Sequence, residues 1–339
     1  MLVESDICFS ALRCPRDKAQ LLWNGRDRLV SDTGEIGGEL GYPLIDGTPV
    51  LIDFDTSILN REAVLESAGS SVVERNSYRG MSRIVKRMLS PAKKSTRENV
   101  MALMAEIKKL LPPVRMLVVG GGSIGQGMEV FYDAPDIQIY AFDIYKSPNT
   151  QFIADAHHMP LPDGFFDVVV VQAVLEHVLQ PSEVVAEIWR VLKDEGLVYA
   201  ETPFMQQVHE GAYDFTRFTE SGHRYLFRRF DVIRSGASGG PGTQFMWSVD
   251  YLVRSVFRSR TAGKLAKLAF FWAQYLDYVV PPNYAIDAAS GVFFFGRKAQ
   301  AEIPPVAMAK YYQGAQQAQT HIEKDRFEPI APPSSLILN

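Results

Sequence analysis

The stretch from Arg115 to Gly127 reads RMLVVGGGSIGQG, an apolar run followed at once by a glycine-rich turn. The apolar run predicts a buried strand, because short runs rich in valine favour extended chain. Glycine lacks a Cβ atom, so the backbone of the turn can approach a ligand closely. A helix that follows such a turn directs its first N–H groups at the ligand. We therefore predict a strand, a ligand-binding turn and a helix that begins near Gly125.

Three glycines of this turn, Gly120, Gly122 and Gly125, satisfy the G-x-G-x-x-G pattern of dinucleotide-binding turns. Asp143 ends the next apolar run, at about the spacing expected of an acid that binds ribose hydroxyls. NAD and S-adenosylmethionine both suit these features. The turn by itself therefore leaves both cofactors open, together with a glycine-rich turn that binds no ligand.

Apolar runs alternate with a helical pattern through the centre of the chain. Strands are predicted at residues 115–119, 137–142, 166–171, 197–201, 231–235 and 292–296, and a helix at 182–192. Such alternation predicts an α/β fold with a parallel sheet and helices on both faces.

Four segments divide the chain. Residues 1–56 predict a small β-rich module, 57–112 a helical connector, 113–300 the α/β domain with a helical insert at 240–290, and 301–339 a polar tail. The connector is basic, since residues 79–109 hold nine Lys or Arg and two Glu. A charge run of this kind is more often a solvated face than a surface for an anionic partner.

Net charge and cysteine content limit the partners and the cellular compartment that can be expected. The net charge of −4 argues against a surface built for nucleic acid, so nucleic acid is not expected as a partner. The two cysteines, Cys8 and Cys14, and an N-terminus without a basic start and apolar stretch predict a cytoplasmic protein. The longest apolar uncharged run, 268–276, is far shorter than the roughly 20 residues of a membrane-spanning helix.

Residues 155–178 carry the motif that distinguishes between NAD and S-adenosylmethionine as the predicted cofactor. They read DAHHMPLPDGFFD, then four valines, then QAVLEHV. This stretch resembles the class I S-adenosylmethionine-dependent methyltransferases, in the Methyltransferase type 11 branch that includes small-molecule enzymes. The resemblance covers residues 114–235 and 291–298. It implies a Rossmann-like, doubly wound sheet of seven strands whose last strand is antiparallel, and S-adenosyl-L-methionine as the cofactor.

The resemblance also implies which residues hold the cofactor. The glycines would line its methionine part, the acid after the second strand would bind the ribose, and the Asp-Ala pair would meet the adenine. Residue 118, where many relatives carry an acid, is Val118, so one cofactor contact is lost or replaced. The cofactor-binding residues are then Gly120, Gly122, Gly125, Asp143, Asp155, Ala156 and Gln172.

A second motif follows the fifth predicted strand. Residues 209–219 read HEGAYDFTRFT and resemble a loop of bacterial methyltransferases that act near glycan or lipid biosynthesis. His209 is the predicted catalytic base, since imidazole titrates near neutral pH, and Asp214 is predicted to orient it. Tyr213 and Arg217 are predicted to bind the substrate, with Arg217 as an anion clamp. An Asp214–Arg217 pair that only pins the loop is the alternative.

Other ionisable residues are given structural roles. Glu176 and His177 open the helix after the fourth strand, and we expect them to fix that turn rather than to act in catalysis. His157 and His158 belong to the adenine-side loop, because no third ligand stands at the spacing of a metal site. No metal site is predicted.

The N-terminal module and the insert complete the prediction. Residues 12–17 and 41–51 resemble the zinc ribbon of Trm112-like proteins, but Asp17 replaces the second cysteine and the downstream cysteine pair is missing. The module is therefore interpreted as a ribbon that has lost its metal. The apolar insert, with five basic residues between 250 and 267, is a lid, a homodimer surface or a helix pair peripheral to the inner membrane face.

Together these features predict a methyltransferase that O-methylates a small molecule, a sugar or a lipid-linked intermediate. An NAD-dependent oxidoreductase is one alternative. A non-catalytic cofactor-binding scaffold that recruits a protein or RNA is another.

Overall fold

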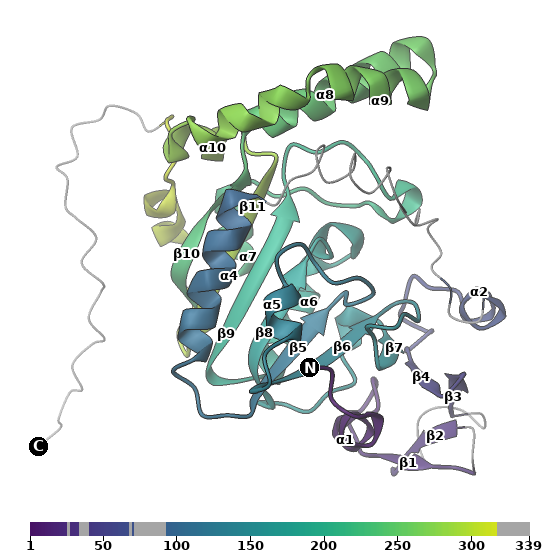
Figure 1. The fold of residues 1–339 in the computed structure, drawn as a ribbon. Helices are drawn as coiled ribbons and strands as arrows, with labels where there is room; N and C mark the ends of the chain where they lie inside the picture. Colours follow the sequence, from purple (N-terminus) through teal and green to yellow (C-terminus); the bar gives the residue numbers. More distant parts are fainter. Residues whose placement is uncertain (26–27, 34–40, 68–69, 71–92, 317–339) are drawn as a thin grey trace, which may run out of the picture.

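The computed structural model describes residues 1–25, 28–33, 41–67, 70 and 93–316 (Figure 1). Its centre is a sheet in which seven strands follow the order β7-β6-β5-β8-β9-β11-β10. β11 is antiparallel to both of its neighbours, whereas β5 to β9 are parallel to one another. The Rossmann-like α/β fold and its antiparallel last strand are therefore confirmed. The strands are β5 (Val114–Val119), β6 (Ile137–Asp143), β7 (Phe152–Ala154), β8 (Phe166–Gln172), β9 (Leu192–Pro203), β10 (Phe230–Gly239) and β11 (Gly291–Lys298).

The N-terminal strands extend this sheet, which corrects the prediction of a sheet of seven strands. β1 (Leu21–Trp23), β2 (Arg28–Ser31), β3 (Tyr42–Ile45) and β4 (Thr48–Leu51) make it a continuous sheet of eleven strands. β4 pairs in parallel with β7, where Val50 lies opposite Ile153. Without β4, the outer edge of β7 would present unpaired N–H and C=O groups. The pairing also carries the residues that follow β4 toward the end of β6.

Both faces of the central strands are buried, and alternate residues point to opposite faces. Val169 and Val171 of β8 pack with Ile188 of α6 (Pro181–Val191). Val168 and Val170 pack with the helices of the other face, α4 (Lys94–Ile107) and α5 (Glu129–Tyr132). Successive side chains of a strand point to opposite faces of the sheet, so a strand that is buried on both faces needs an apolar residue at every position. This explains the unbroken run of valines. α1 (Ser5–Ala11) and α7 (Glu220–Leu226) lie on the face of α6.

The helix after the glycine turn differs from its prediction. α5 begins at Glu129 rather than near Gly125 and has four residues. The dipole of so short a helix contributes little at the turn. Backbone groups of the turn itself therefore remain as the N–H donors there.

The connector and the tail are described in part. α2 (Arg61–Glu66) and α4 are helical as predicted, while residues 71–92, with four of the nine basic residues, lie outside the described residues. The tail is described to residue 316 and includes η6 (Pro305–Tyr311). It is anchored there, because the hydroxyl of Tyr312 donates to Asp287 at 2.6 Å.

The insert forms a helical hairpin at one end of the sheet. It consists of α8 (Pro241–Phe257), α9 (Arg260–Ala269), η5 (Phe271–Tyr278) and α10 (Pro282–Asp287). α8 and α9 project beyond the edge of the main body (Figure 1). Asp277 accepts N–H groups of Gly240, Gly242 and Thr243 at the start of α8, which fixes the base of the hairpin. Among the described residues, none of the helices combines the length and apolarity needed to cross a bilayer.

Asp17, which replaces a cysteine of the ribbon motif, is bound by hydroxyl groups. Ser31 and Thr33 donate to its carboxylate at 3.0 and 2.8 Å, and the N–H of Ala19 donates at 3.0 Å. Burial would raise the pKa of Asp17, but hydrogen bonds from Cys14 and from these donors lower it to about 2. An ionised carboxylate with three donors is satisfied by the protein itself.

Replacing Cys14 with Ser is therefore expected to leave the zinc content of the purified protein unchanged. Cys14 and Asp17 supply two candidate ligands, whereas a structural zinc ion needs four. Elemental analysis of the wild type and of Cys14→Ser, prepared side by side, gives the comparison. A loss of one zinc per chain in the variant would show that the N-terminal module binds metal.

Candidate functional site

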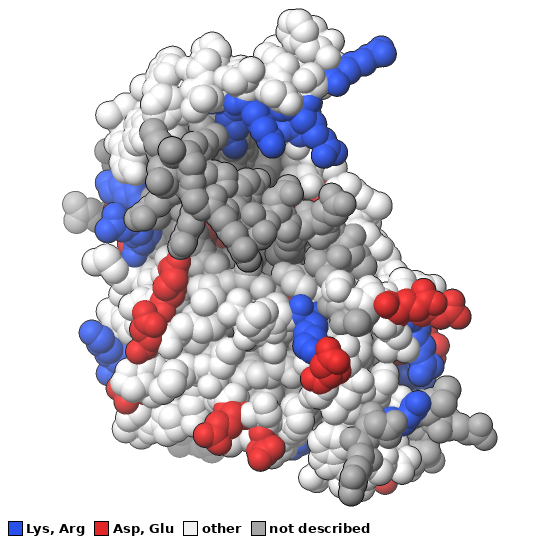
Figure 2. Space-filling view, turned by 45° about the vertical axis from the view of Figure 1, so that its right-hand side comes forward, with Lys and Arg blue, Asp and Glu red and all other residues white. Residues whose placement is uncertain are grey.

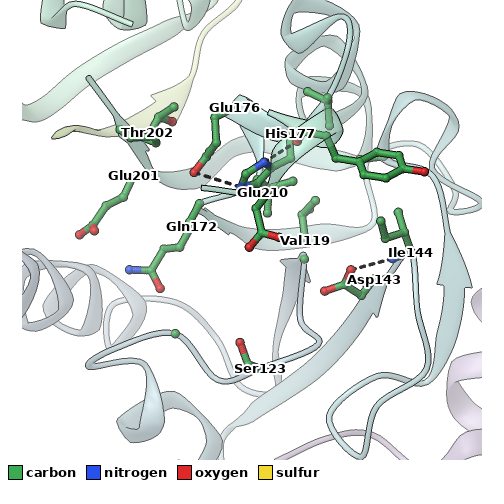
Figure 3. A pocket seen from close by; sticks show the side chains of 18 of the residues that line it. Val119, Ser123, Asp143, Ile144, Gln172, Glu176, His177, Glu201, Thr202 and Glu210 are labelled. Carbon is green, nitrogen blue, oxygen red and sulfur yellow. Dashed lines mark hydrogen bonds and ion pairs between the residues drawn. The ribbon is translucent and has the colours of Figure 1, made fainter. Parts of the chain in front are cut away.

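A cavity of about 500 Å³ opens at the carboxyl ends of β5, β6, β8 and β9 (Figure 3). In open α/β sheets, ligands bind in the crevice outside these ends. The sequence-predicted residues that line the cavity are Gly120, Gly125, Asp143, Asp155, Ala156, Gln172, His209 and Tyr213. One cavity thus holds residues from both predicted motifs.

The glycine turn fits tightly against the strands beside it. The N–H of Gly122 donates to Asp143 at 2.8 Å. A Cβ atom on Gly122 would lie 2.6 Å from the carboxylate of Asp143, and one on Gly125 would lie 2.0 Å from Oε1 of Gln172. Gly120 has a φ of +74°, which an L side chain rarely adopts. All three glycines are needed for this turn to lie where it does.

Asp143 is positioned by the backbone on both sides of it. Besides the bond from Gly122, its carboxylate accepts the N–H of Ile144 at 2.7 Å (Figure 3). The residue is 9% exposed and lies at the end of β6. Two fixed donors hold the carboxylate in one orientation at the wall of the cavity.

Asp155 is engaged with the protein more fully than the sequence predicts. One oxygen accepts the N–H of His157 at 3.0 Å and lies 2.6 Å from its Nδ1, and the other accepts the hydroxyl of Ser57. Burial would raise the pKa of Asp155, but the bonds from His157 and Ser57 lower it. Ala156, beside it, lines the cavity.

Residues after the N-terminal module form part of the same wall. Ile58 and Leu59 line the cavity near Ala156, next to Ser57. The sequence places these residues at the start of a connector and carries no signal for this contact. The contact depends on the pairing of β4 with β7, which no local pattern encodes.

His209 lines the same cavity, and its side chain lies beside Asp214. Nδ1 of His209 lies 3.1 Å from Oδ2 of Asp214, and the same oxygen accepts the backbone N–H of His209 at 2.9 Å. The side chain of Asp214 is 1% exposed. Burial would raise the pKa of Asp214, but hydrogen bonds from Arg217 and His209 lower it to about 2. The ionised carboxylate lies beside the imidazole and holds the backbone of His209.

Arg217 is committed to its own loop. Its guanidinium donates to both oxygens of Asp214 and to the carbonyls of Gln206, Gln207 and Thr216. These bonds use all five N–H groups of the side chain. The geometry fits the alternative in which Asp214 and Arg217 pin the loop, and neither residue lines the cavity.

Glu176 and His177, assigned a structural role from the sequence, also line the cavity. They lie in η3 (Leu175–His177), where the side chain of Glu176 is 1% exposed and its Oε1 lies 3.7 Å from Nε2 of His177 (Figure 3). Nδ1 of His177 lies 2.7 Å from the carbonyl oxygen of Tyr213. Burial raises the pKa of Glu176 to about 8 and lowers that of His177.

The rings of His177 and His209 are neighbours, with centroids 4.9 Å apart. Glu210 lines the cavity beside them, and its carboxyl projects into the cavity near His177 (Figure 3). Four ionisable side chains therefore gather opposite the glycine turn. The sequence predicts a role in the reaction for His209 alone among them.

Comparison with known families identifies part of the chain. The family described as "Methyltransferase domain" matches residues 117–200, which include the glycine turn, Asp143, Asp155 and Gln172. No curated protein sequence matches the chain.

Several solved structures have related folds. A Galdieria sulphuraria protein assigned as a sarcosine dimethylglycine methyltransferase is 15% identical (60% of this chain, 86% of that one, TM-score 0.41). Phosphoethanolamine N-methyltransferase 2 of Haemonchus contortus is 15% identical (60% and 53%, TM-score 0.39), so this chain spans about half its length. The 1,6-didemethyltoxoflavin-N1-methyltransferase of Burkholderia thailandensis is 13% identical (67% and 94%, TM-score 0.38). At these identities and scores, none of the three bears on the acceptor.

Proposed function

We propose, from the premise that this chain carries a class I S-adenosylmethionine-dependent methyltransferase domain, that it methylates a hydroxyl group of a small molecule, a sugar or a lipid-linked intermediate. One observation carries the proposal. A single cavity has the glycine turn and Asp143 at one end and an imidazole oriented by a carboxylate at the other. Methylation of a hydroxyl needs a bound methyl donor and a separate group that accepts the hydroxyl proton.

The residues around the glycine turn fit the cofactor. When bound, S-adenosylmethionine supplies a methyl carbon made electrophilic by the adjacent sulfonium. Gly120 and Gly125 of the turn line the cavity, where the methionine part would lie. Asp143 is placed to accept hydrogen bonds from ribose hydroxyls. Ala156, Ile58 and Leu59 offer an apolar wall for the adenine.

His209 is the residue that we assign to proton removal from the acceptor. The ionised carboxylate of Asp214 lies 3.1 Å from Nδ1 and favours the tautomer with the proton on that nitrogen, which leaves the lone pair on Nε2. A base held in this way can take the hydroxyl proton as the oxygen approaches the methyl carbon. The acceptor hydroxyl would donate its hydrogen bond to Nε2 of His209 directly or through one water molecule.

Calorimetric titration with S-adenosylhomocysteine, S-adenosylmethionine and NAD tests the proposed cofactor. We expect the first two to bind one molecule per chain and NAD to show no saturable binding. Binding of NAD in place of the other two would favour an oxidoreductase. Binding of S-adenosylmethionine without any product from a panel of sugar, lipid-linked and small-molecule hydroxyl acceptors would favour the scaffold alternative.

The base of the insert shapes the acceptor end of the cavity. Trp247 of α8 lines the cavity, and the hydroxyl of Tyr251 donates to the carbonyl of Val208 at 2.7 Å. α8 thus packs on the loop that carries His209. This contact supports the lid interpretation for the first half of α8, where it would select among acceptors.

The far half of the hairpin has different neighbours, and for it we propose contact with an anionic membrane surface. Leu252, Val256, Phe257 and Leu265 are each more than 60% exposed. Residues 251–276 contain five Lys or Arg and no Asp or Glu. In Figure 2, Lys and Arg side chains gather along the hairpin at the top of the molecule, and the Asp and Glu side chains lie below. Apolar side chains flanked by cations suit an interface of anionic lipid.

Phe257→Asp is expected to weaken binding to vesicles that contain an anionic phospholipid by at least about tenfold, because it replaces an exposed ring that would insert into the lipid with a charge. Leu111→Asp, at a side chain 90% exposed and outside the hairpin, is the matched control and should bind as the wild type does. Co-sedimentation measures both. A wild type that stays in solution with these vesicles would exclude the membrane contact. If that wild type also forms a dimer that Phe257→Asp breaks, the exposed face is a homodimer surface.

A further inference from the structure

Three side chains of the metal-binding kind meet at the acceptor end of the cavity. Glu176 and His177 lie in η3, and His209 lies in the loop after β9. One ligand atom from each lies within 4.8 Å of the other two. Within the part of the chain that the structure describes, they are the one group of His, Cys, Asp or Glu close enough to share a cation.

Both imidazoles are held in the tautomer that leaves Nε2 with a lone pair. Nδ1 of His177 lies 2.7 Å from the carbonyl oxygen of Tyr213, which can only accept, so Nδ1 carries the hydrogen. Nδ1 of His209 lies 3.1 Å from the carboxylate of Asp214, whose charge favours the same tautomer. Metal-binding histidines are commonly fixed like this, with a carbonyl or a carboxylate accepting from the second ring nitrogen.

The carboxyl of Glu176 lacks the partners that a buried carboxyl needs. Oε2 is buried with no hydrogen-bond partner among the described residues, and Oε1 lies 3.7 Å from Nε2 of His177. A buried polar group without a partner costs roughly 1–3 kcal/mol. Two lone-pair atoms at this separation leave room between them for a cation at about 2.1 Å from each.

We propose that Glu176, His177 and His209 bind one divalent transition-metal cation and that its open coordination position faces the acceptor hydroxyl. Two imidazoles, one carboxylate and an open position are the ligand set of catalytic zinc sites, so Zn²⁺ is the simplest occupant. Glu210, which projects into the cavity beside His177 (Figure 3), adds negative charge near the cation. The sequence predicts no metal site, because His209 lies 32 residues after the adjacent pair Glu176 and His177.

This inference rests on the proposed function and changes the part that His209 plays in it. With the cation bound, His209 is a ligand, and coordination lowers the pKa of the acceptor hydroxyl. The hydroxyl proton passes to water. The acceptor oxygen then forms its bond to the methyl carbon as the bond from that carbon to sulfur breaks, and S-adenosylhomocysteine is the leaving group.

Calorimetric titration of the chelator-treated full chain with Zn²⁺ tests the site. We expect one Zn²⁺ per chain in the wild type, and binding at least about 100-fold weaker in Glu176→Gln, His177→Gln and His209→Gln. His158→Gln, at a histidine outside the cavity, and Cys14→Ser, in the ribbon, are matched controls that should bind as the wild type does. Co²⁺ gives a second readout, because its visible absorption in a site with nitrogen ligands should be lost in the same three variants.

Binding of S-adenosylhomocysteine by each preparation shows that the variant is folded. His209→Gln, at a side chain 27% exposed, carries the test if the buried Glu176→Gln does not fold. A wild type that binds S-adenosylhomocysteine but not Zn²⁺ would overturn the cation site and leave His209 as the direct base. Zn²⁺ binding that survives the substitutions would overturn the ligand assignment. A folded wild type that does not bind S-adenosylhomocysteine would overturn the proposed function instead, whatever its affinity for Zn²⁺.

Discussion

Replacing His209 with Gln is expected to lower kcat by roughly 10²–10⁴ while the affinity for S-adenosylhomocysteine stays within a few-fold. The imidazole lines the cavity, and the residues beside it, His177 and Asp214, belong neither to the glycine turn nor to the strand end that carries Asp143. Gln keeps a side chain of similar size but cannot take a proton or replace a neutral imidazole as a ligand. The expected loss is the same whether His209 removes the proton itself or holds a cation that acidifies the hydroxyl.

Asp214→Asn is the companion variant for this prediction. It weakens the Asp214–Arg217 pair that pins the loop as well as the orientation of His209, so kcat should fall by a smaller factor and the melting temperature should fall with it. His158→Gln should leave kcat unchanged. Once an acceptor is identified, steady-state kinetics measures all three. An unchanged kcat with a raised KM or a lower melting temperature in His209→Gln would mean that His209 only holds the loop.

Replacing Asp143 with Ala is expected to weaken binding of S-adenosylhomocysteine by about 1.5–3 kcal/mol, or roughly 10–150-fold. The substitution removes the charged acceptor assigned to the ribose hydroxyls. It also removes the acceptor for the N–H of Gly122, so the glycine turn loses one of its attachments. Both changes act on cofactor binding.

Calorimetry on the wild type, Asp143→Ala and Asp143→Asn separates these two contributions. Asn keeps an oxygen that can accept from Gly122 but loses the charge, so its affinity should lie between the other two. Asp133→Ala, outside the cavity, is the control for loss of a negative charge. If Asp143→Ala binds S-adenosylhomocysteine as tightly as the wild type does, Asp143 does not bind the ribose hydroxyls. The main reason for placing the cofactor beside Asp143 would then be lost.

Some of the fold follows from local patterns in the sequence. The four valines at 168–171 predict a strand covered on both faces, and alternate valines do pack on helices of opposite faces. The glycines at 120, 122 and 125 predict close approach, and a Cβ atom at either of the last two would collide with a neighbouring side chain. Such features could be predicted because burial and backbone freedom act on residues that are neighbours along the chain.

The rest of the site was decided by tertiary structure. The sequence predicts that Arg217 is an anion clamp, but in the structure its five N–H groups all donate to acceptors of its own loop. Ile58 and Leu59 reach the cavity because β4 pairs with β7. Sequence spacing carries no information on these contacts, since they depend on the register of distant strands and on the path of loops between them.

The amino-acid sequence by itself therefore determined the α/β sheet, the glycine turn and the acid after the second strand. Each of these depends on side-chain period, on φ or on a short spacing. Tertiary structure alone decided that Glu176 and His177 lie beside His209. Loops at the carboxyl ends of two parallel strands meet in space however far apart they lie in sequence, and the chemistry of this site depends on that meeting.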